Sequence, residues 1–333
     1  MRAVLLTMAA LAALGLTGAV AVVALGLYNV SAVAGHLPGV SWVLHTTFRN
    51  SVWLRAPSEE EVPELDDAEL IALGAGHYAT ACVPCHGAPG QEASATMQAM
   101  VPEPPQIEEA VAHWEANELF WIVENGIKMT GMPGWPAEGR DDEVWAVVAY
   151  LVSVQGEVAP ELELQTGGSE PEEYCASCHG EVGGQVPRLD LLSAEYLEAQ
   201  LQAYRSGKRP SGIMAQAVTS VPEERLSELA THFAETADEA GDAPVASAEL
   251  VVKGEALARE GTRDVPTCLA CHGEREDGRR KGPVLDGQRR GFLEVQLTLW
   301  RDGVYAYDPL MHAAARDLSN EDIEALAAYF ARR

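Results

Sequence analysis

The sequence predicts an all-α protein, in which an N-terminal transmembrane helix is followed by three helical domains. Three observations predict it: an uncharged apolar run opens the chain, one cysteine motif recurs at equal intervals, and each interval closes with the apolar spacing of an amphipathic helix. Segments with the alternating pattern of strands are sparse. A chain of 333 residues has room for two or three domains that each bury a core.

The first element is an uncharged apolar run from Ala3 to about Tyr28, preceded by the single charge of Arg2. At ~1.5 Å per helical residue, this run is long enough to cross a bilayer. A cleaved signal peptide is the alternative, but its apolar part is usually only ~7 to 15 residues long. We therefore expect an uncleaved membrane anchor over residues 1–30, with the remainder of the chain exported.

The next segment, residues 31–64, mixes aromatic and basic side chains. Trp42 and Trp53, together with Arg49 and Arg55, are typical of a segment that lies at a membrane interface. A short helix packed on the following domain fits the same residues. Both interpretations stay open at this point.

The cysteine motif sets the domain organisation. It reads CVPCH at 82–86, CASCH at 175–179 and CLACH at 268–272, so its copies start 93 residues apart and together use all six cysteines. Two stretches rich in Gly, Pro, Ala and acidic residues, 156–170 and 238–247, have the composition of linkers. The predicted domains are residues 65–155, 171–237 and 248–333.

Each predicted domain closes with apolar residues at positions i, i+3, i+4 and i+7, the buried stripe of an amphipathic helix. These residues are Val144, Val147, Val148 and Leu151; Leu226, Leu229, Ala230 and Phe233; and Ile323, Leu326, Ala327 and Phe330. Ser220 and Ser319 each precede an acidic residue by three positions, which predicts that each serine begins the helix after it.

The motif CxxCH indicates a covalently bound haem. Two cysteines three positions apart lie on one face of a helical turn, so both thiols reach one planar ligand, and the adjacent histidine is placed to coordinate a metal at its centre. The expected thioether positions are Cys82, Cys85, Cys175, Cys178, Cys268 and Cys271, and the expected iron ligands are His86, His179 and His272.

Other uses of paired cysteines fit less well. Tetrahedral zinc takes four protein ligands, and one motif supplies fewer. A redox dithiol of the thioredoxin type expects a βαβ context, of which the sequence gives no sign. A disulfide across two residues closes a very short loop and gains little from it.

With CxxCH, a downstream proline, a methionine and a closing helix, each domain resembles a class I cytochrome c. The second and third domains also align with each other, from Pro187 and from Pro283, and are similar to the tandem domains of di-haem cytochromes c. The resemblance covers about residues 65 to 333. It implies small helical folds around three covalently attached haem c groups, electron transfer, and haem loading in the periplasm, with the anchor in a bacterial inner membrane.

A methionine on the far side of each iron would close the haem and raise its potential. The expected ligands are Met214 and Met311 in the last two domains. In the first domain we favour Met132 over Met129, because Met-Pro-Gly-aromatic resembles the family's ligand loop. His312 adjoins Met311 but points in another direction on a helix. We interpret it as a surface or core residue, and assign structural roles to His77, His113 and His232.

In this family a carbonyl between the two ligands orients the haem histidine through its other ring nitrogen. Pro187 and Pro283 match that position by alignment, and in the first domain we favour Pro105 over Pro104. The second domain departs from the family, because too few residues precede Cys175 to form the usual opening helix. We expect a neighbouring domain to cover it.

The net charge of −27 is unevenly distributed: residues 56–165 carry 21 acidic and 2 basic side chains, whereas residues 248–333 carry 15 and 13. Nucleic acid is excluded as a partner, because phosphate binding needs the opposite sign. We expect the acidic first domain to meet a basic protein. A basic cluster is predicted to serve another contact; it consists of Arg279, Arg280, Lys281, Arg289 and Arg290.

These features predict a membrane-anchored electron relay and not an enzyme, with a dehydrogenase or respiratory complex as donor and a cytochrome or terminal oxidase as acceptor. The alternative is the cytochrome subunit of a periplasmic alcohol or aldehyde dehydrogenase, whose tri-haem layout is similar. A di-haem peroxidase would need an open iron, whereas each domain supplies a methionine. A haem-based sensor would need an output domain, of which the sequence gives no sign.

Overall fold

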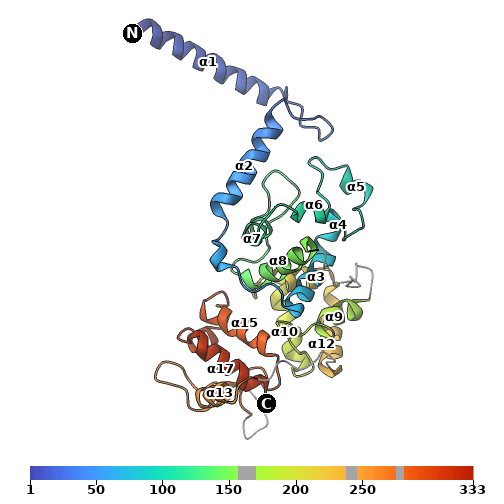
Figure 1. Ribbon diagram of the computed structural model, residues 1–333, viewed down its shortest axis with the longest axis vertical. Coiled ribbons are helices and arrows are strands. Elements are labelled where there is room, and N and C mark those ends of the chain that lie inside the picture. Colours follow the sequence, from blue (N-terminus) through green and yellow to red (C-terminus); the bar gives the residue numbers. More distant parts are fainter. Residues whose placement is uncertain (157–169, 238–245, 275–280, 333) are drawn as a thin grey trace.

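The computed structural model describes residues 1–156, 170–237, 246–274 and 281–332, so the predicted linkers fall almost wholly outside the described residues. The described parts are helical, as predicted. The one β-type pairing among them is an isolated bridge between Ala88 and Gln91. Figure 1 shows the helical units below a long N-terminal helix.

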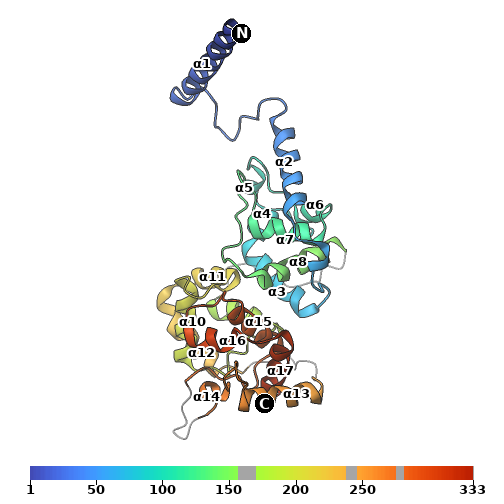
Figure 2. The ribbon, with the colours of Figure 1, turned by 90° about the vertical axis from the view of Figure 1, so that its left-hand side faces the viewer.

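Helix α1, Arg2–Ala24, stands apart from the other helices, and none of its residues is buried (Figures 1 and 2). It has 23 residues and a mean hydropathy of 2.1. At ~1.5 Å per residue its length matches the ~30 Å apolar core of a bilayer. Among the described residues, this is the one helix long and apolar enough to cross a membrane.

Helix α2, Val40–Arg55, supports the packed-helix interpretation of the segment that follows α1, and a position at a membrane interface stays a prediction. One side packs on the first unit, where the ring centroid of Phe48 lies 5.3 Å from that of Trp114 and Val52 is fully buried. The side chains of Trp42 and Trp53 are exposed. The segment is therefore a packed helix that still presents aromatic side chains outward.

The first unit is built around the crossing of two helices, its opening helix α3 and its closing helix α8. A Cβ atom on Gly74 of α3 would lie only 1.9 Å from the carbonyl oxygen of Ala146 in α8, so the close crossing requires glycine. Tyr78, Phe120 and Tyr150 belong to the core beside this crossing. The helices are α3 (Ala68–Ala81), α4 (Val83–His86), α5 (Ala95–Gln98), α6 (Ile107–Val111), α7 (Ala116–Asn125) and α8 (Asp141–Gln155), preceded by the short η1 (Glu59–Glu61).

The third unit repeats this crossing between its own first and last helices. A Cβ atom on Gly254 would lie 1.9 Å from the carbonyl oxygen of Ala325, the same clearance as in the first unit. Trp300, Tyr305 and Phe330 lie in the core formed there. The helices are α13 (Ala248–Glu260), α14 (Leu269–His272), α15 (Arg290–Arg301), α16 (Pro309–Ala315) and α17 (Asn320–Ala331).

The second unit has no opening helix among its described residues, and its own core is small. Its helices are α9 (Pro171–His179), α10 (Ala194–Arg205), α11 (Gly212–Thr219) and α12 (Leu226–Glu235), with the short η2 (Glu223–Arg225) before the last. Val182 and Val186 pack on Leu73 of α3 and Ala146 of α8. A neighbouring unit therefore covers it, as predicted, and Figure 2 shows the two units in contact.

The predicted closing helices are present, and every residue of their three apolar stripes is buried. Ser319 begins α17 with reciprocal hydrogen bonds to Asp322, as predicted. The prediction for Ser220 is wrong, because α11 extends to Thr219 and the serine ends that helix. Its hydroxyl donates back to the carbonyl of Gln216 at 3.2 Å.

Replacing Gly74 with alanine should destabilise the first unit by roughly 2 kcal/mol, because the new methyl group would overlap the backbone of α8. Chemical denaturation followed by circular dichroism measures this. Gly156→Ala is the matched control, since its nearest neighbouring atom would be 3.7 Å away. We expect the control to change stability by less than ~0.5 kcal/mol. If Gly74→Ala and Gly156→Ala were equally stable, the close crossing of α3 and α8 would be contradicted.

Candidate haem sites

Each cysteine motif folds as a helical turn that ends at its histidine: α4 at His86, α9 at His179 and α14 at His272. The N–H of His86 donates to the carbonyl of Cys82 at 2.9 Å, and that of His272 to the carbonyl of Cys268 at 3.0 Å. All six cysteines are free of disulfides. The two thiols of a motif therefore lie on the same side of one turn, next to the histidine.

Burial raises the pKa of the first thiol in every motif, to about 12 for Cys82 and Cys175 and to about 11 for Cys268. The second cysteine of each motif adds to the rise. A redox dithiol reacts as the thiolate and needs a lowered pKa. These surroundings therefore disfavour the redox interpretation and fit thiols that are consumed in stable thioether bonds.

The ring of each motif histidine is oriented by a proline carbonyl. The Nδ1-to-oxygen distances are 2.9 Å for His86 and Pro105, 3.3 Å for His179 and Pro187, and 2.9 Å for His272 and Pro283. Because Nδ1 is held by the carbonyl, Nε2 is the nitrogen left to bind iron. Burial lowers the pKa of His272, which favours the neutral ring that a metal needs. The three predicted proline contacts are confirmed.

The methionines differ in their surroundings. Met129 is 81% exposed, with a positive backbone φ of 66°, so it does not pack in the core. Met132 is half-buried. Met311 packs against the core of the third unit, and Met214 lines a cavity in the second. These observations favour Met132 over Met129, while the ligand role of the three methionines stays a prediction.

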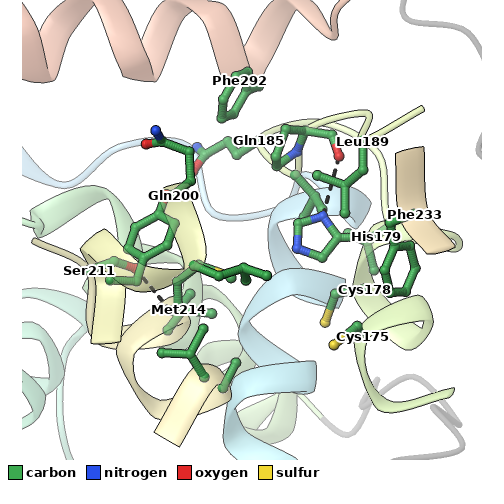
Figure 3. Close-up of a pocket in the computed structure, with 18 of the residues that line it drawn as sticks. Cys175, Cys178, His179, Gln185, Leu189, Gln200, Ser211, Met214, Phe233 and Phe292 are labelled. Carbon is green, nitrogen blue, oxygen red and sulfur yellow. Dashed lines mark hydrogen bonds between the residues drawn. The ribbon is translucent and has the colours of Figure 1, made fainter. Parts of the chain in front are cut away.

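The second unit contains a cavity of about 360 Å³, a size typical of ligand sites. Cys175, Cys178, His179 and Met214 all lie in its wall, as Figure 3 shows. Much of the remaining wall is apolar, with side chains such as Leu197, Leu201, Val218, Leu229 and Phe233. The wall thus offers two thiols, an imidazole, a thioether and an apolar surround.

A buried cation also lines this cavity. Arg209 is 6% exposed, its Nη1 donates to Gln200 at 2.7 Å, and its guanidinium lies 4.8 Å from the ring centroid of Tyr204. Its Nε has no hydrogen-bond partner within the part of the chain that the structure describes. A buried N–H without a partner fits a ligand with an anionic edge, such as the carboxylates of haem. The residues present therefore fit a haem in this cavity.

Neighbouring units complete the wall. Gly76 of α3 faces the second cysteine turn so closely that a Cβ atom there would lie 3.2 Å from the sulfur of Cys178. Leu73 of α3 lines the cavity too, and the third unit contributes Leu285 and Phe292. The short segment before Cys175 was the sequence signal that the second unit lacks an opening helix. It did not show which residues of the other units would cover the cavity.

The other histidines already have surroundings of their own. His77 is buried, its ring centroid lies 4.8 Å from that of Trp135, and burial lowers its pKa to about 4. His312 contacts the carbonyl of Trp300 through Nδ1 at 2.7 Å, and His113 is exposed. Core packing or a surface position therefore accounts for each of these histidines. His77 also lines the cavity of the second unit.

The predicted basic docking cluster is wrong for Arg289. This side chain is 6% exposed, and its Nη1 donates to the carbonyl of Val186 at 2.7 Å, which joins the third unit to the second. Arg290 pairs with Glu294 at 2.6 Å. The prediction failed for Arg289 because this residue packs between units, whereas a docking role for Arg290 and the exposed Lys281 stays a prediction. Arg279 and Arg280 lie outside the described residues.

Comparisons with known proteins point to one family. Residues 69–151 match the family model described as cytochrome C oxidase, cbb3-type, subunit III. The thiosulfate dehydrogenase electron acceptor of Stutzerimonas stutzeri (strain A1501) is 34% identical over 218 residues, which is 59% of this chain and 94% of that protein. Cytochrome c4 of Pseudomonas aeruginosa is 31% identical over 173 residues, 49% of this chain and 85% of that protein.

Among solved structures, thiosulfate dehydrogenase (TsdBA) from Marichromatium purpuratum is 31% identical over 48% of this chain and 36% of that chain, with a TM-score of 0.42. The sequence relatives and the cysteine motifs agree. The chain belongs to the cytochrome c family, the electron carriers that hold haem covalently. Membership of the cytochrome c family is thereby confirmed, while the number of three haems and the dehydrogenase-like layout stay predictions.

If Met132 is the ligand predicted for the first haem, replacing it with alanine should open that haem to added ligands, because the thioether would be gone. Titrating the ferric protein with cyanide and recording optical spectra should then show one new tight site per chain. Met129→Ala is the matched control and should leave the titration unchanged, since that side chain is exposed. If only the control opened a site, the assignment of the two methionines would be reversed.

Proposed function

We propose that this chain is a membrane-anchored carrier that relays single electrons through three His/Met-ligated haems on the periplasmic side of a bacterial inner membrane. The observation that carries the proposal is a geometry repeated three times: a CxxCH turn whose histidine is held through Nδ1 by a proline carbonyl. The apolar helix α1 supports the membrane anchor.

When bound, each haem iron would accept and release one electron, with no chemical change of a substrate. His86, His179 and His272 would hold the iron, because the proline carbonyls occupy each Nδ1 and leave Nε2 available to bind it. Met132, Met214 and Met311 would close the other side. Apolar walls keep water out, which favours the less charged reduced state.

A dehydrogenase is the electron donor that the relatives favour. The thiosulfate dehydrogenase electron acceptor of Stutzerimonas stutzeri aligns with this chain over 94% of its own length. This supports a role as the acceptor subunit of a periplasmic dehydrogenase, the class of the predicted alternative, while leaving the donor's substrate open. Co-purification of a larger catalytic chain would distinguish such a subunit from a free carrier.

The haem content of the purified protein tests the proposal. We expect the chain, expressed with the cytochrome c maturation machinery, to fractionate with membranes and to carry three covalent haems per chain. A methionine-to-iron charge-transfer band should appear in the oxidised spectrum. A ratio of one or two haems, or a high-spin spectrum at any site, would contradict the proposed relay.

The acidic first unit should make electron transfer to a basic partner depend on salt. Its exposed carboxylates include Glu59, Glu60, Glu92, Glu103, Glu109, Glu115 and Glu138. Stopped-flow oxidation of the reduced chain by a basic cytochrome c should slow about tenfold as salt is raised to physiological strength, because screening removes electrostatic steering. An acidic cytochrome is the control and should not slow. A salt-independent rate would reject the docking surface.

A further inference from the structure

Glu143, near the start of α8 in the first unit, holds the helix that carries Met214 in the second. The side chain is 4% exposed. Its Oε2 accepts hydrogen bonds from the backbone N–H groups of Gly212 at 2.6 Å and Ile213 at 3.3 Å. The hydroxyl of Ser211 donates to its Oε1. One carboxylate therefore binds the first turn of α11.

The same carboxylate reaches the methionine segment of the first site. The indole Nε1 of Trp135, three residues after Met132, donates to Oε2 of Glu143 at 3.2 Å. The indole also packs directly on α11, since a Cβ atom on Gly212 would lie 2.4 Å from Nε1. The segments that carry Met132 and Met214 thus meet at Glu143.

The carboxylate is fixed from behind by Arg140. Nη2 of Arg140 lies 2.8 Å from Oε1 of Glu143, and its Nη1 donates to the carbonyl of Pro210 at 2.8 Å and to the hydroxyl of Tyr305 at 3.3 Å. All of these contacts are buried or partly buried. Glu143 therefore has few alternative positions, and α11 is tied to a rigid point on the first unit.

In the third unit, the carboxylate that caps the methionine helix comes from the same unit. There Asp308 begins α16, and its Oδ1 accepts the N–H groups of Leu310 at 2.9 Å and Met311 at 3.2 Å. In the second unit the corresponding cap is Ser211, which accepts from the N–H of Met214 at 2.9 Å (Figure 3). The negative charge at that helix start comes from the neighbouring unit instead.

We propose that Glu143 is a positioning residue for the second haem site: it fixes α11 so that the thioether of Met214 stays on the iron. This rests on the proposed function, because it presumes that Met214 is the ligand. It makes the ligation of the second site depend on the first unit, whereas Asp308 gives the third site its own support.

Glu143→Gln in the full chain tests this. A glutamine offers one acceptor oxygen and places an amide N–H₂ against the N–H donors and Arg140, so α11 loses its anchor. Cyanide should then bind the ferric iron of one site about tenfold more tightly, which corresponds to ~1.4 kcal/mol. In a potentiometric titration, one of the three haem potentials should fall and two should stay.

The affected site is identified by combining variants. Met214→Ala opens the second site outright, so adding Glu143→Gln to it should change the cyanide titration no further. Asp308→Asn is the matched control for the third unit, and its effect should add to that of Met214→Ala. A further change from Glu143→Gln in the Met214→Ala background would overturn the proposal.

Folding defects are separated from positioning. If Glu143→Gln unfolds at lower denaturant but keeps the cyanide affinities and potentials of the natural chain, Glu143 is only a structural residue and the proposal fails. If that variant takes up no haem, Glu143→Asp keeps the charge but draws the carboxylate back from the N–H of Gly212 and leaves the Ser211 cap in place, and we expect the same shift at about threefold. No shift there also overturns it. Failure of the proposed function is seen separately, in the haem content of the natural chain.

Discussion

The arrangement of this molecule depends on helix α3, which contacts two of its helical units at once. Gly74 and Gly76 are two positions apart, so at 3.6 residues per turn they lie on nearly opposite sides of the helix. On one side Gly74 lets α8 approach until backbone touches backbone. On the other, Gly76 leaves room for the sulfur of Cys178. A larger residue would collide with the backbone of α8 at Gly74, or with the sulfur of Cys178 at Gly76.

The second unit depends on both of its neighbours: it packs on α3 of the first unit and is hydrogen-bonded to the third. The third unit is joined to it by a reciprocal pair of hydrogen bonds, in which the side chain of Gln288 accepts from the N–H of Arg188 at 2.7 Å and donates to its carbonyl at 2.9 Å. Gln288 is 2% exposed, so these bonds are shielded from water. These contacts hold the second unit in a fixed relation to both outer units, which suits the proposed relay, since no part of it has to move.

The parts that the sequence predicted are those set by local pattern. CxxCH, the proline after it and the i, i+3, i+4, i+7 stripes each lie within one short segment, and the turns and stripes formed as expected. Contacts between distant segments were missed: Glu143 and Ser211 are 68 residues apart, and Arg289 and Val186 are 103 apart. A charged residue that looks like surface in the sequence can be buried when another unit supplies its partner. The prediction for Ser220 failed for a local reason, because the preceding helix α11 extends to this serine and the next helix begins only at Glu223.

The buried charges at the junction do not add much to stability by themselves. Removing a carboxylate and a guanidinium from water costs several kcal/mol, which their attraction roughly repays. Removing one partner alone would strand the other, at ~3–5 kcal/mol. Arg140 pairs with Asp142 and Glu143, and the remaining hydrogen bonds of Arg140 and Glu143 include those to the carbonyl of Pro210 and from the N–H of Gly212. The guanidinium of Arg209 lies 5.2 Å from the ring centroid of Tyr305, so a buried charge of the second unit also depends on the position of the third unit. Apolar contacts therefore supply the free energy of assembly, and these polar contacts select the single orientation in which the methionine helix of the second site faces its cavity.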